Sequence, residues 1–174
     1  MADNGLIITV ADVGDAEVLT SLSVTTFLET FLLDNKKEDM DKYIAEEMNI
    51  ARLTDELKDP ENVFFLAKYR DAFVAYAKMR AVKVPTELKD QNPVELERIY
   101  VLRQYHAQKV GAALMHHCLD HARSKHYNTM WLGVWEHNYK AVNFYKKWGF
   151  EFFGSHIFRL GDDDQTDMLM KKPL

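Results

Sequence analysis

The sequence predicts a single α/β domain built on a sheet of mixed strand direction. From residue 94 onward the patterns alternate as strand, helix, strand, helix and two final strands, an order typical of α/β proteins. Two earlier apolar segments, 63–67 and 73–79, are joined by a short turn and are expected to pair. At 174 residues and 47% hydrophobic composition, the chain is long enough for one core. We therefore expect one domain that spans residues 1–174.

The first half of the chain supplies short elements around that core. Residues 6–10 form the first expected strand, and a helix starts near Asp12 or Asp15, either of which can cap it. An aromatic-rich stretch, a polar amphipathic helix, a second short helix and a loop are expected at 27–33, 38–48, 51–58 and 83–93. No repeat, low-complexity tract or linker interrupts the sequence.

Residues 94–102 alternate as a strand. Its apolar members are Leu96, Ile99 and Val101. The alternation slips near Glu97 and Arg98, which indicates a β-bulge that would re-aim the strand and leave backbone groups free. Strict alternation would point Glu95 and Glu97 the same way, whereas a bulge would separate them.

The next helix is expected to open at His106 and to bury one face. Its apolar positions are Val110, Ala113, Leu114, Cys118 and Ala122. A phosphate group would sit well at the amino end of this helix, where unpaired N–H groups and the helix dipole favour negative charge. Cys118 lies on the apolar face, so we expect a small buried thiol and no intrachain disulfide.

The segment 129–150 combines a buried strand, an amphipathic helix and a sharp exit. The strand 129–135 is expected to run parallel to the strand 94–102, because a helix connects them. Asn138 suits the cap of the following helix, and Tyr145, seven residues later, lies on the same helical face. Gly149 and Phe150 end the helix.

Composition limits the classes of function. The net charge is −5, with 27 acidic against 22 basic residues, which argues against a nucleic-acid-binding surface and is compatible with a cationic ligand. No apolar run reaches the ~20 residues that a membrane-spanning helix needs. The amino terminus lacks the basic and apolar parts of a signal peptide. We expect a cytoplasmic protein that binds neither nucleic acid nor membranes.

Histidines on the helix after residue 110 raise the question of a metal site. His117 and His121 have the i, i+4 spacing found in zinc sites, and His116 lies beside them. The sequence has no HExxH or CxxC motif and no obvious third ligand. We favour surface histidines and expect no metal.

The pattern from Asn138 to Phe150 resembles the carboxyl-terminal half of the Gcn5-related N-acetyltransferase (GNAT) superfamily: an Asn, a small residue three positions on, a Tyr, and then Gly-Phe. The earlier loop fits the pyrophosphate loop of that superfamily in the register His106, Lys109, Gly111. This register has His in place of Arg or Gln and Lys in place of Gly; a second register starting at Gln108 satisfies the letters but shifts the helix.

This resemblance implies a single-domain GNAT fold whose sheet is mixed and mostly antiparallel, with a parallel strand pair that splays apart and flanking helices. It implies acetyl-coenzyme A (acetyl-CoA) as the acetyl donor. Donor contacts are implied for the end of the first parallel strand, the loop and the later helix: Ile99, Tyr100, Val101, His106, Ala107, Gln108, Lys109, Val110, Gly111, Ala112, Asn138 and Lys147. Exposed lysines on a helix face explain Lys147 equally well.

Longer segments resemble the PaiA-type spermidine/spermine N-acetyltransferases. They are residues 26–31, 95–101, 131–136 with 144–147, and 161–170. The resemblance implies a polyamine acceptor held by carboxylates and aromatic faces, for which Glu29, Glu95 and Trp135 are candidates. A different small amine, a protein amino terminus, or a CoA- or polyamine-sensing module without catalysis remains an alternative. A homodimer is common in the superfamily.

Acetyl transfer to an amine requires the removal of a proton. Presenting the neutral form of an alkylammonium at pH 7 costs roughly 4.6 kcal/mol, because its solution pKa is near ~10.4. Glu97, acting through water, is our candidate base; Glu95 is the alternative, and either carboxylate can instead bind the ammonium or pair with Arg98. Tyr145 is the candidate acid for the leaving thiolate, and a Tyr packed under the Gly-Phe exit is its structural alternative.

Overall fold

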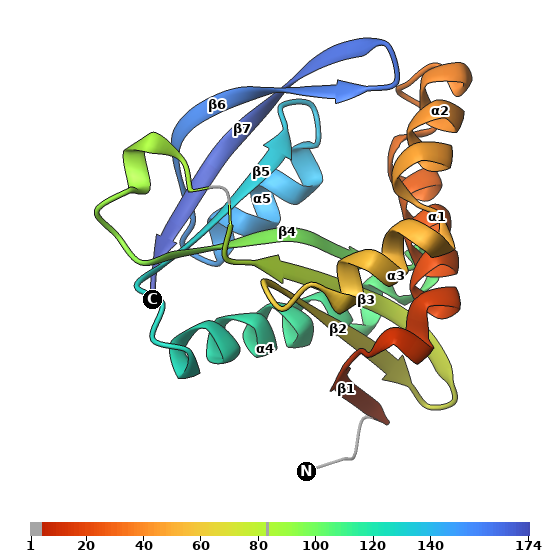
Figure 1. The fold of residues 1–174 in the computed structure, drawn as a ribbon, viewed down its shortest axis with the longest axis horizontal. Coiled ribbons are helices and arrows are strands. Elements are labelled where there is room, and N and C mark those ends of the chain that lie inside the picture. The colour runs from red at the N-terminus through yellow and green to blue at the C-terminus, as the bar shows by residue number, and fades with distance from the viewer. Residues whose placement is uncertain (1–4, 83) are drawn as a thin grey trace.

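The computed structural model describes residues 5–82 and 84–174, which form one seven-stranded sheet with helices on both faces (Figure 1). The strand order is β1, β2, β3, β4, β5, β7, β6, and β4 and β5 are the parallel neighbours of this sheet. The strands are β1 (Leu6–Val10), β2 (Asn62–Tyr69), β3 (Ala72–Arg80), β4 (Pro93–Val101), β5 (Thr129–Trp135), β6 (Glu151–Leu160) and β7 (Asp163–Pro173). The predicted single-domain α/β class with a mixed, mostly antiparallel sheet is confirmed.

Eight helical segments connect and cover these strands. The α-helices are α1 (Ala16–Phe31), α2 (Lys37–Glu47), α3 (Ile50–Lys58), α4 (Val110–Ser124) and α5 (Tyr139–Lys147); the 3-10 helices are η1 (Val13–Asp15), η2 (Thr86–Leu88) and η3 (Arg103–Gln108). The expected strands 6–10 and 129–135 coincide with β1 and β5. Asp12 caps η1, because its carboxylate accepts a hydrogen bond from the Gly14 N–H at 2.7 Å. The expected loop 83–93 contains η2, and its residue 83 lies outside the described residues.

The helix that was expected to open at His106 begins instead at Val110. Lys109, between η3 and α4, has a φ of 58°, in the left-handed region. A right-handed helix does not continue through such a residue, so the chain makes a 3-10 segment, turns at Lys109 and then starts α4. The turn brings the first turn of α4 close to the end of β4, since a Cβ at Gly111 would lie 3.5 Å from Val101 Cγ2.

The parallel pair is joined at one end and open at the other. β4 and β5 are paired at three positions, from Pro93 with Thr129 to Glu95 with Trp131. β4 runs on to Val101 and β5 to Trp135, but within the described sheet no pairing between them continues past Glu95. The two strands therefore splay apart, and the facing backbone groups of β4 are left available in the gap.

A β-bulge lies in β4 where the sequence predicted one. Lys78 of β3 pairs with Arg98, and the next residue, Met79, pairs with Leu96, so Glu97 is the extra residue. The expectation that this bulge would separate Glu95 from Glu97 is wrong. Both carboxylates contact the Arg80 guanidinium, because the extra residue places Glu97 and Arg98 together on the face that Glu95 already occupies.

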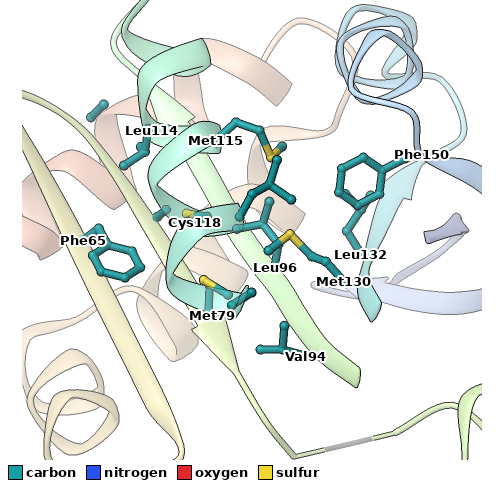
Figure 2. Packing of buried hydrophobic residues seen from close by; sticks show 14 of the residues in the cluster. Phe65, Met79, Val94, Leu96, Leu114, Met115, Cys118, Met130, Leu132 and Phe150 are labelled. Carbon is teal, nitrogen blue, oxygen red and sulfur yellow. The ribbon is translucent and has the colours of Figure 1, made fainter. Parts of the chain in front are cut away.

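Two apolar layers hold the sheet between its helices. On one face, Leu114, Met115 and Cys118 of α4 pack against residues such as Leu96 and Leu132 of the strands, as Figure 2 shows. On the other face, α1 and α3 cover β2 and β3 through a second cluster, formed by Ala11, Leu19, Leu22, Leu53, Phe64, Leu66 and Tyr76. None of the helices in the described ranges is both long and apolar enough to cross a membrane.

Candidate active site

The gap between β4 and β5 connects a groove on one face of the sheet with a cavity on the other. The groove, of about 330 Å³, lies between β4, the η3–α4 loop, β5 and α5. The cavity, of about 1120 Å³, lies between α1, α2, α3 and the strands β3 to β7. Four residues line both spaces: Glu97, Arg98, Tyr100 and Gly133. These residues lie at the boundary of the two spaces, where β4 and β5 are unpaired, and we call this boundary the passage.

The η3–α4 loop closes one end of the groove with backbone donors and cations. Gly111 and Ala112 line it in the first turn of α4, where the N–H groups have no helical partner. His106 bridges two elements: its Nε2 donates to the Val101 carbonyl at 2.8 Å, and its Nδ1 accepts from Lys140 Nζ at 2.7 Å. With Lys109 beside them, these groups form a positively charged end to the groove.

The α5 wall of the groove carries Asn138 and Tyr145. The Asn138 Oδ1 accepts from the Ala141 N–H at 3.2 Å, so this side chain caps α5 while it also lines the groove. Tyr145 lies two turns further on, packed edge-on against Phe144 and Phe150. Burial raises the pKa of its phenol above the ordinary value, so the hydroxyl is protonated at neutral pH.

A cluster of six charged side chains lies between the cavity and the sheet. We call it the charge cluster; its members are Glu56, Lys78, Arg80, Glu95, Glu97 and Arg98. Lys78 Nζ lies 2.6 Å from Glu97 Oε2 and 3.0 Å from Glu56 Oε2, and its side chain is 3% exposed. Arg98 binds Glu56 through both terminal nitrogens, at 3.0 and 3.3 Å. Three acids thus face three bases, which satisfies charges that burial would otherwise penalise.

The pKa values of the two candidate bases, Glu97 and Glu95, are shifted in opposite directions. Burial alone would raise the pKa of Glu97, but the three surrounding cations, Arg98 foremost, outweigh it and hold the pKa below its ordinary value. Burial raises the pKa of Glu95 above its ordinary value in spite of the hydrogen bond from Arg80. Glu97 lines both spaces at the passage, whereas Glu95 lines the cavity.

Aromatic side chains line the side of the cavity that faces α1 and α2. Phe27 is buried and Phe31 is partly buried in one apolar cluster, and both line this cavity as well. Tyr43 stacks on Phe27 with ring centroids 5.1 Å apart, and Trp135 meets Phe31 edge-on at 6.0 Å. The cavity therefore combines aromatic faces with carboxylates.

The β6–β7 turn contacts α2 while its three aspartates, 162–164, stay exposed. The Asp162 carboxylate accepts from Lys42 Nζ at 2.6 Å, and its N–H donates to Asp39 Oδ1 at 2.8 Å. Gly161 has a φ of 60°, and a Cβ there would lie 2.5 Å from the Asp39 Cα, so only glycine fits. This contact holds the β6–β7 turn against α2.

Five of the remaining residues that the sequence singled out lie outside the linings of the groove and the cavity. Ala107 and Gln108 are exposed in η3, Val110 is fully buried in the core, and Lys147 is exposed in the last turn of α5. Glu29 fastens α1 to η3: its carboxylate accepts from the Arg103 N–H at 2.8 Å, and its backbone carbonyl accepts from the same arginine side chain. Ile99, Tyr100 and Val101 line the groove, and Trp135 lines the cavity.

Two bases of the charge cluster, Lys78 and Arg80, were not predicted from the sequence, whereas Arg98 was named as a partner for Glu95 or Glu97. Lys78 and Arg80 stand two residues apart in β3, which is otherwise apolar, and Glu95 and Glu97 are also two apart in β4. Arg80 lies opposite Glu95, and Lys78 lies opposite Arg98, next to the extra residue Glu97. Charges with matching i, i+2 spacing on neighbouring strands are a signal for cross-strand ion pairs that could have been used. Glu56 comes from α3 and had no such signal.

Two of the three histidines of α4 pack against Phe65, and the third is exposed. The rings of His117 and His121 meet Phe65 edge-on, with centroids 4.6 and 5.1 Å away. His116 is exposed and lies 3.1 Å from Asp120. Within residues 5–82 and 84–174, no group of three or more His, Cys, Asp or Glu side chains is placed to hold a metal ion.

A splayed parallel pair, with a groove that ends at a helix amino terminus, defines a protein that binds a long anionic molecule along a strand edge. The model of the acetyltransferase (GNAT) family matches residues 25–150, so the chain belongs to that family. An uncharacterised N-acetyltransferase of Lactobacillus delbrueckii subsp. lactis is 36% identical over 160 residues, 92% of each chain. One of Mycobacterium tuberculosis is 31% identical over 92% of this chain and 98% of its own.

Solved structures share the fold at lower sequence identity. The PaiA N-acetyltransferase of Thermoplasma acidophilum, determined with coenzyme A, superposes with a TM-score of 0.80 at 20% identity, covering 97% of this chain and 99% of its own. The ribosomal-protein-S18-alanine N-acetyltransferase of Escherichia coli gives 0.64 at 18% identity, covering 97% and 93%. The second of these names states an acceptor, the alanine of ribosomal protein S18, and the first states none.

Proposed function

We propose that this protein transfers an acetyl group from acetyl-CoA directly to a primary amine, with spermidine and spermine as the preferred acceptors. The observation that carries the proposal is the passage between β4 and β5, where the groove and the cavity share Glu97, Arg98, Tyr100 and Gly133. A donor in the groove and an amine in the cavity can meet there, so the transfer needs no covalent intermediate on the enzyme.

The groove suits acetyl-CoA along its whole length. The free N–H groups of Gly111 and Ala112, with Lys109 and Lys140, match the charge of a pyrophosphate. Beyond Glu95 the exposed edge of β4 offers backbone groups that can pair with the amides of a pantetheine arm. When bound, acetyl-CoA supplies an activated acetyl thioester.

Tyr145 is the proposed proton donor to the leaving sulfur. Its phenol lines the groove on α5, and the raised pKa keeps the proton in place at neutral pH until a thiolate forms. Asn138, which caps the same helix, holds the position of this face. The phenol therefore holds the proton that a donor to the leaving sulfur requires.

Glu97 is proposed to act through hydrogen bonding at the passage. Because three cations lower the pKa of Glu97, its carboxylate stays ionised and is a weak proton acceptor. We propose that it orients the acceptor nitrogen, or a water that leads the proton away. Glu95, bound by Arg80, supports this arrangement from the cavity side.

A polyamine fits the cavity by size and by chemistry. The cavity of about 1120 Å³ is open enough for an extended chain, and its aromatic faces can contact ammonium groups and methylenes. Acids outnumber bases in its lining; the acids are Glu47, Asp55, Glu56, Asp59, Glu87, Glu95, Glu97 and Asp167, and the bases are Arg52, Lys78, Arg80, Arg98 and Arg159. The excess of negative charge favours a cation.

The test is the release of free thiol from acetyl-CoA with a panel of acceptors: spermidine, spermine, a monoamine, a peptide with a free amino terminus, and no amine. Rapid release confined to the two polyamines supports both parts of the proposal. Release with the monoamine or the peptide keeps the acetyltransferase and discards the polyamine. Binding of acetyl-CoA without release under any condition favours a sensing module instead.

A further inference from the structure

Gly133 of β5 borders the passage and lies close to the far wall of the cavity. A methyl group added there would lie 3.4 Å from Asp167 Oδ2 and 3.6 Å from both Cε1 and Nε2 of His156. Asp167 belongs to β7 and His156 to β6, and the two residues face each other in the β6–β7 ladder. Two polar side chains from neighbouring strands therefore point at the residue that borders both the groove and the cavity.

Asp167 and Glu97 differ in how far neighbouring cations neutralise their carboxylates. Glu97 has Lys78, Arg80 and Arg98 within 4.0 Å. The described ion pair of Asp167 is with His156, which is charged only when it is protonated. A new ammonium group at Glu97 would meet three resident cations, whereas at Asp167 it would meet a carboxylate that a neutral imidazole leaves unneutralised.

The geometry of this pair leaves room for a nitrogen between its members. His156 Nε2 and Asp167 Oδ2 are 3.6 Å apart, which is too far for a direct hydrogen bond. An ammonium nitrogen can lie about 2.9 Å from both atoms. Trp135 stands opposite Asp167 in the β5–β7 ladder and lines the same cavity, so an aromatic face borders the site.

We infer that Asp167 and His156 form the acceptor-amine site of this enzyme. Asp167 accepts hydrogen bonds from the reacting ammonium and holds it at Gly133, and His156 takes the proton that must leave before the nitrogen can attack. This inference rests on the proposed acetyl transfer and deepens it, since it moves proton removal from the charge cluster on β4 to the wall formed by β6 and β7.

His156, Tyr145 and solvent account for both protons that leave the nitrogen. The ammonium gives one proton to Nε2 of a neutral His156 that carries its hydrogen on Nδ1, and His156 passes this proton to solvent. The freed nitrogen forms a bond to the acetyl carbonyl carbon while the carbon–sulfur bond breaks, and its electron pair goes to sulfur. Tyr145 gives its phenol proton to the sulfur. The second proton that leaves the nitrogen, as the amide forms, restores the phenol through solvent.

The test compares Asp167→Asn and His156→Ala with Asp164→Asn, which removes the same charge at an exposed position of the same strand outside the cavity lining. Each is measured for thiol release with the best amine and for acetyl-CoA affinity by calorimetry. We expect Asp167→Asn to lower kcat/KM for the amine by about 10- to 100-fold, the effect of losing a hydrogen bond to a charged group, with acetyl-CoA affinity unchanged. Asp164→Asn should match the wild type.

Imidazole rescue provides the second measurement. His156 is 44% exposed, so its replacement by Ala should leave the fold intact, and added imidazole should enter the open cavity and restore part of the lost turnover. A side chain with a purely structural role would not be rescued in this way. The inference is overturned if Asp167→Asn keeps the wild-type kcat/KM for the amine, or if His156→Ala is fully active.

Different results would contradict the proposed acetyl transfer and the assignment of Asp167 and His156. If the wild-type protein releases no thiol with any amine of the panel, the proposed transfer fails and the acceptor site fails with it. If the wild type reacts but both variants react equally well, the acetyltransferase stands and only the assignment of Asp167 and His156 is wrong. Should Asp167→Asn not fold, the His156→Ala result and its rescue decide alone.

Discussion

Lys109 provides a direct test of how the pyrophosphate loop is built. Its φ of 58° places a residue with a Cβ in the left-handed region, which costs about 1–2 kcal/mol relative to glycine. Glycine also gains unfolded-state entropy, which offsets about 0.4–1 kcal/mol of that advantage. Lys109→Gly should therefore be more stable than Lys109→Ala by about 1 kcal/mol. For a chain of this length the difference corresponds to about 2–4 °C in Tm.

The comparison works because both variants remove the same ammonium group and differ only at the backbone. Thermal and urea unfolding of the two proteins measure the stability difference, and calorimetry with acetyl-CoA measures what the lost charge does to affinity. We expect affinity to fall in Lys109→Ala relative to the wild type, since a cation near a phosphate is lost. If Lys109→Ala is as stable as Lys109→Gly, the left-handed turn does not exist in solution and the account of this loop is wrong.

Three further substitutions test the rest of the site. Tyr145→Phe should lower kcat by about 100-fold and leave acetyl-CoA affinity nearly unchanged, because only the proton donor is lost; equal turnover in a chemistry-limited assay removes the acid role. Asn138→Ala should lower the free energy of unfolding by about 1 kcal/mol through loss of the α5 cap, which urea unfolding measures against Asn143→Ala in the exposed helix interior. Glu56→Gln should lower the free energy of unfolding by about 3–5 kcal/mol, since it leaves buried cations uncompensated. Adding Lys78→Met should recover part of this loss. If Glu56→Gln is as stable as the wild type in urea unfolding, the ion pairs of the charge cluster do not form as described.

The sequence predicted those parts of the fold that depend on local pattern. Alternation and helical spacing located β1 and β5 to the residue, and the slip at Glu97 correctly indicated a bulge. The consequence of the bulge was wrong, because alternation describes one strand and cannot show that Arg80 of the neighbouring strand draws Glu95 and Glu97 to a common partner.

The start of α4 was misplaced because the residue that stops the helix is a lysine. Local pattern gives no sign of a left-handed turn at Lys109, and only the resemblance to the superfamily's loop, which has glycine there, marked this position. Contacts between distant segments could not be predicted either. Glu56 on α3 pairs with Arg98 on β4, and His156 meets Asp167 across two strands; such pairs depend on tertiary packing and leave no spacing signal in the sequence.

The central claim is that donor and amine meet in one complex, each from its own side of the sheet. An initial-velocity matrix that varies acetyl-CoA and spermidine together tests it most directly. Direct transfer through the passage at Gly133 and Glu97 predicts double-reciprocal lines that intersect, because both substrates must be bound before either product leaves. Parallel lines would mean that the acetyl group rests on the enzyme between two half-reactions, and would contradict the account.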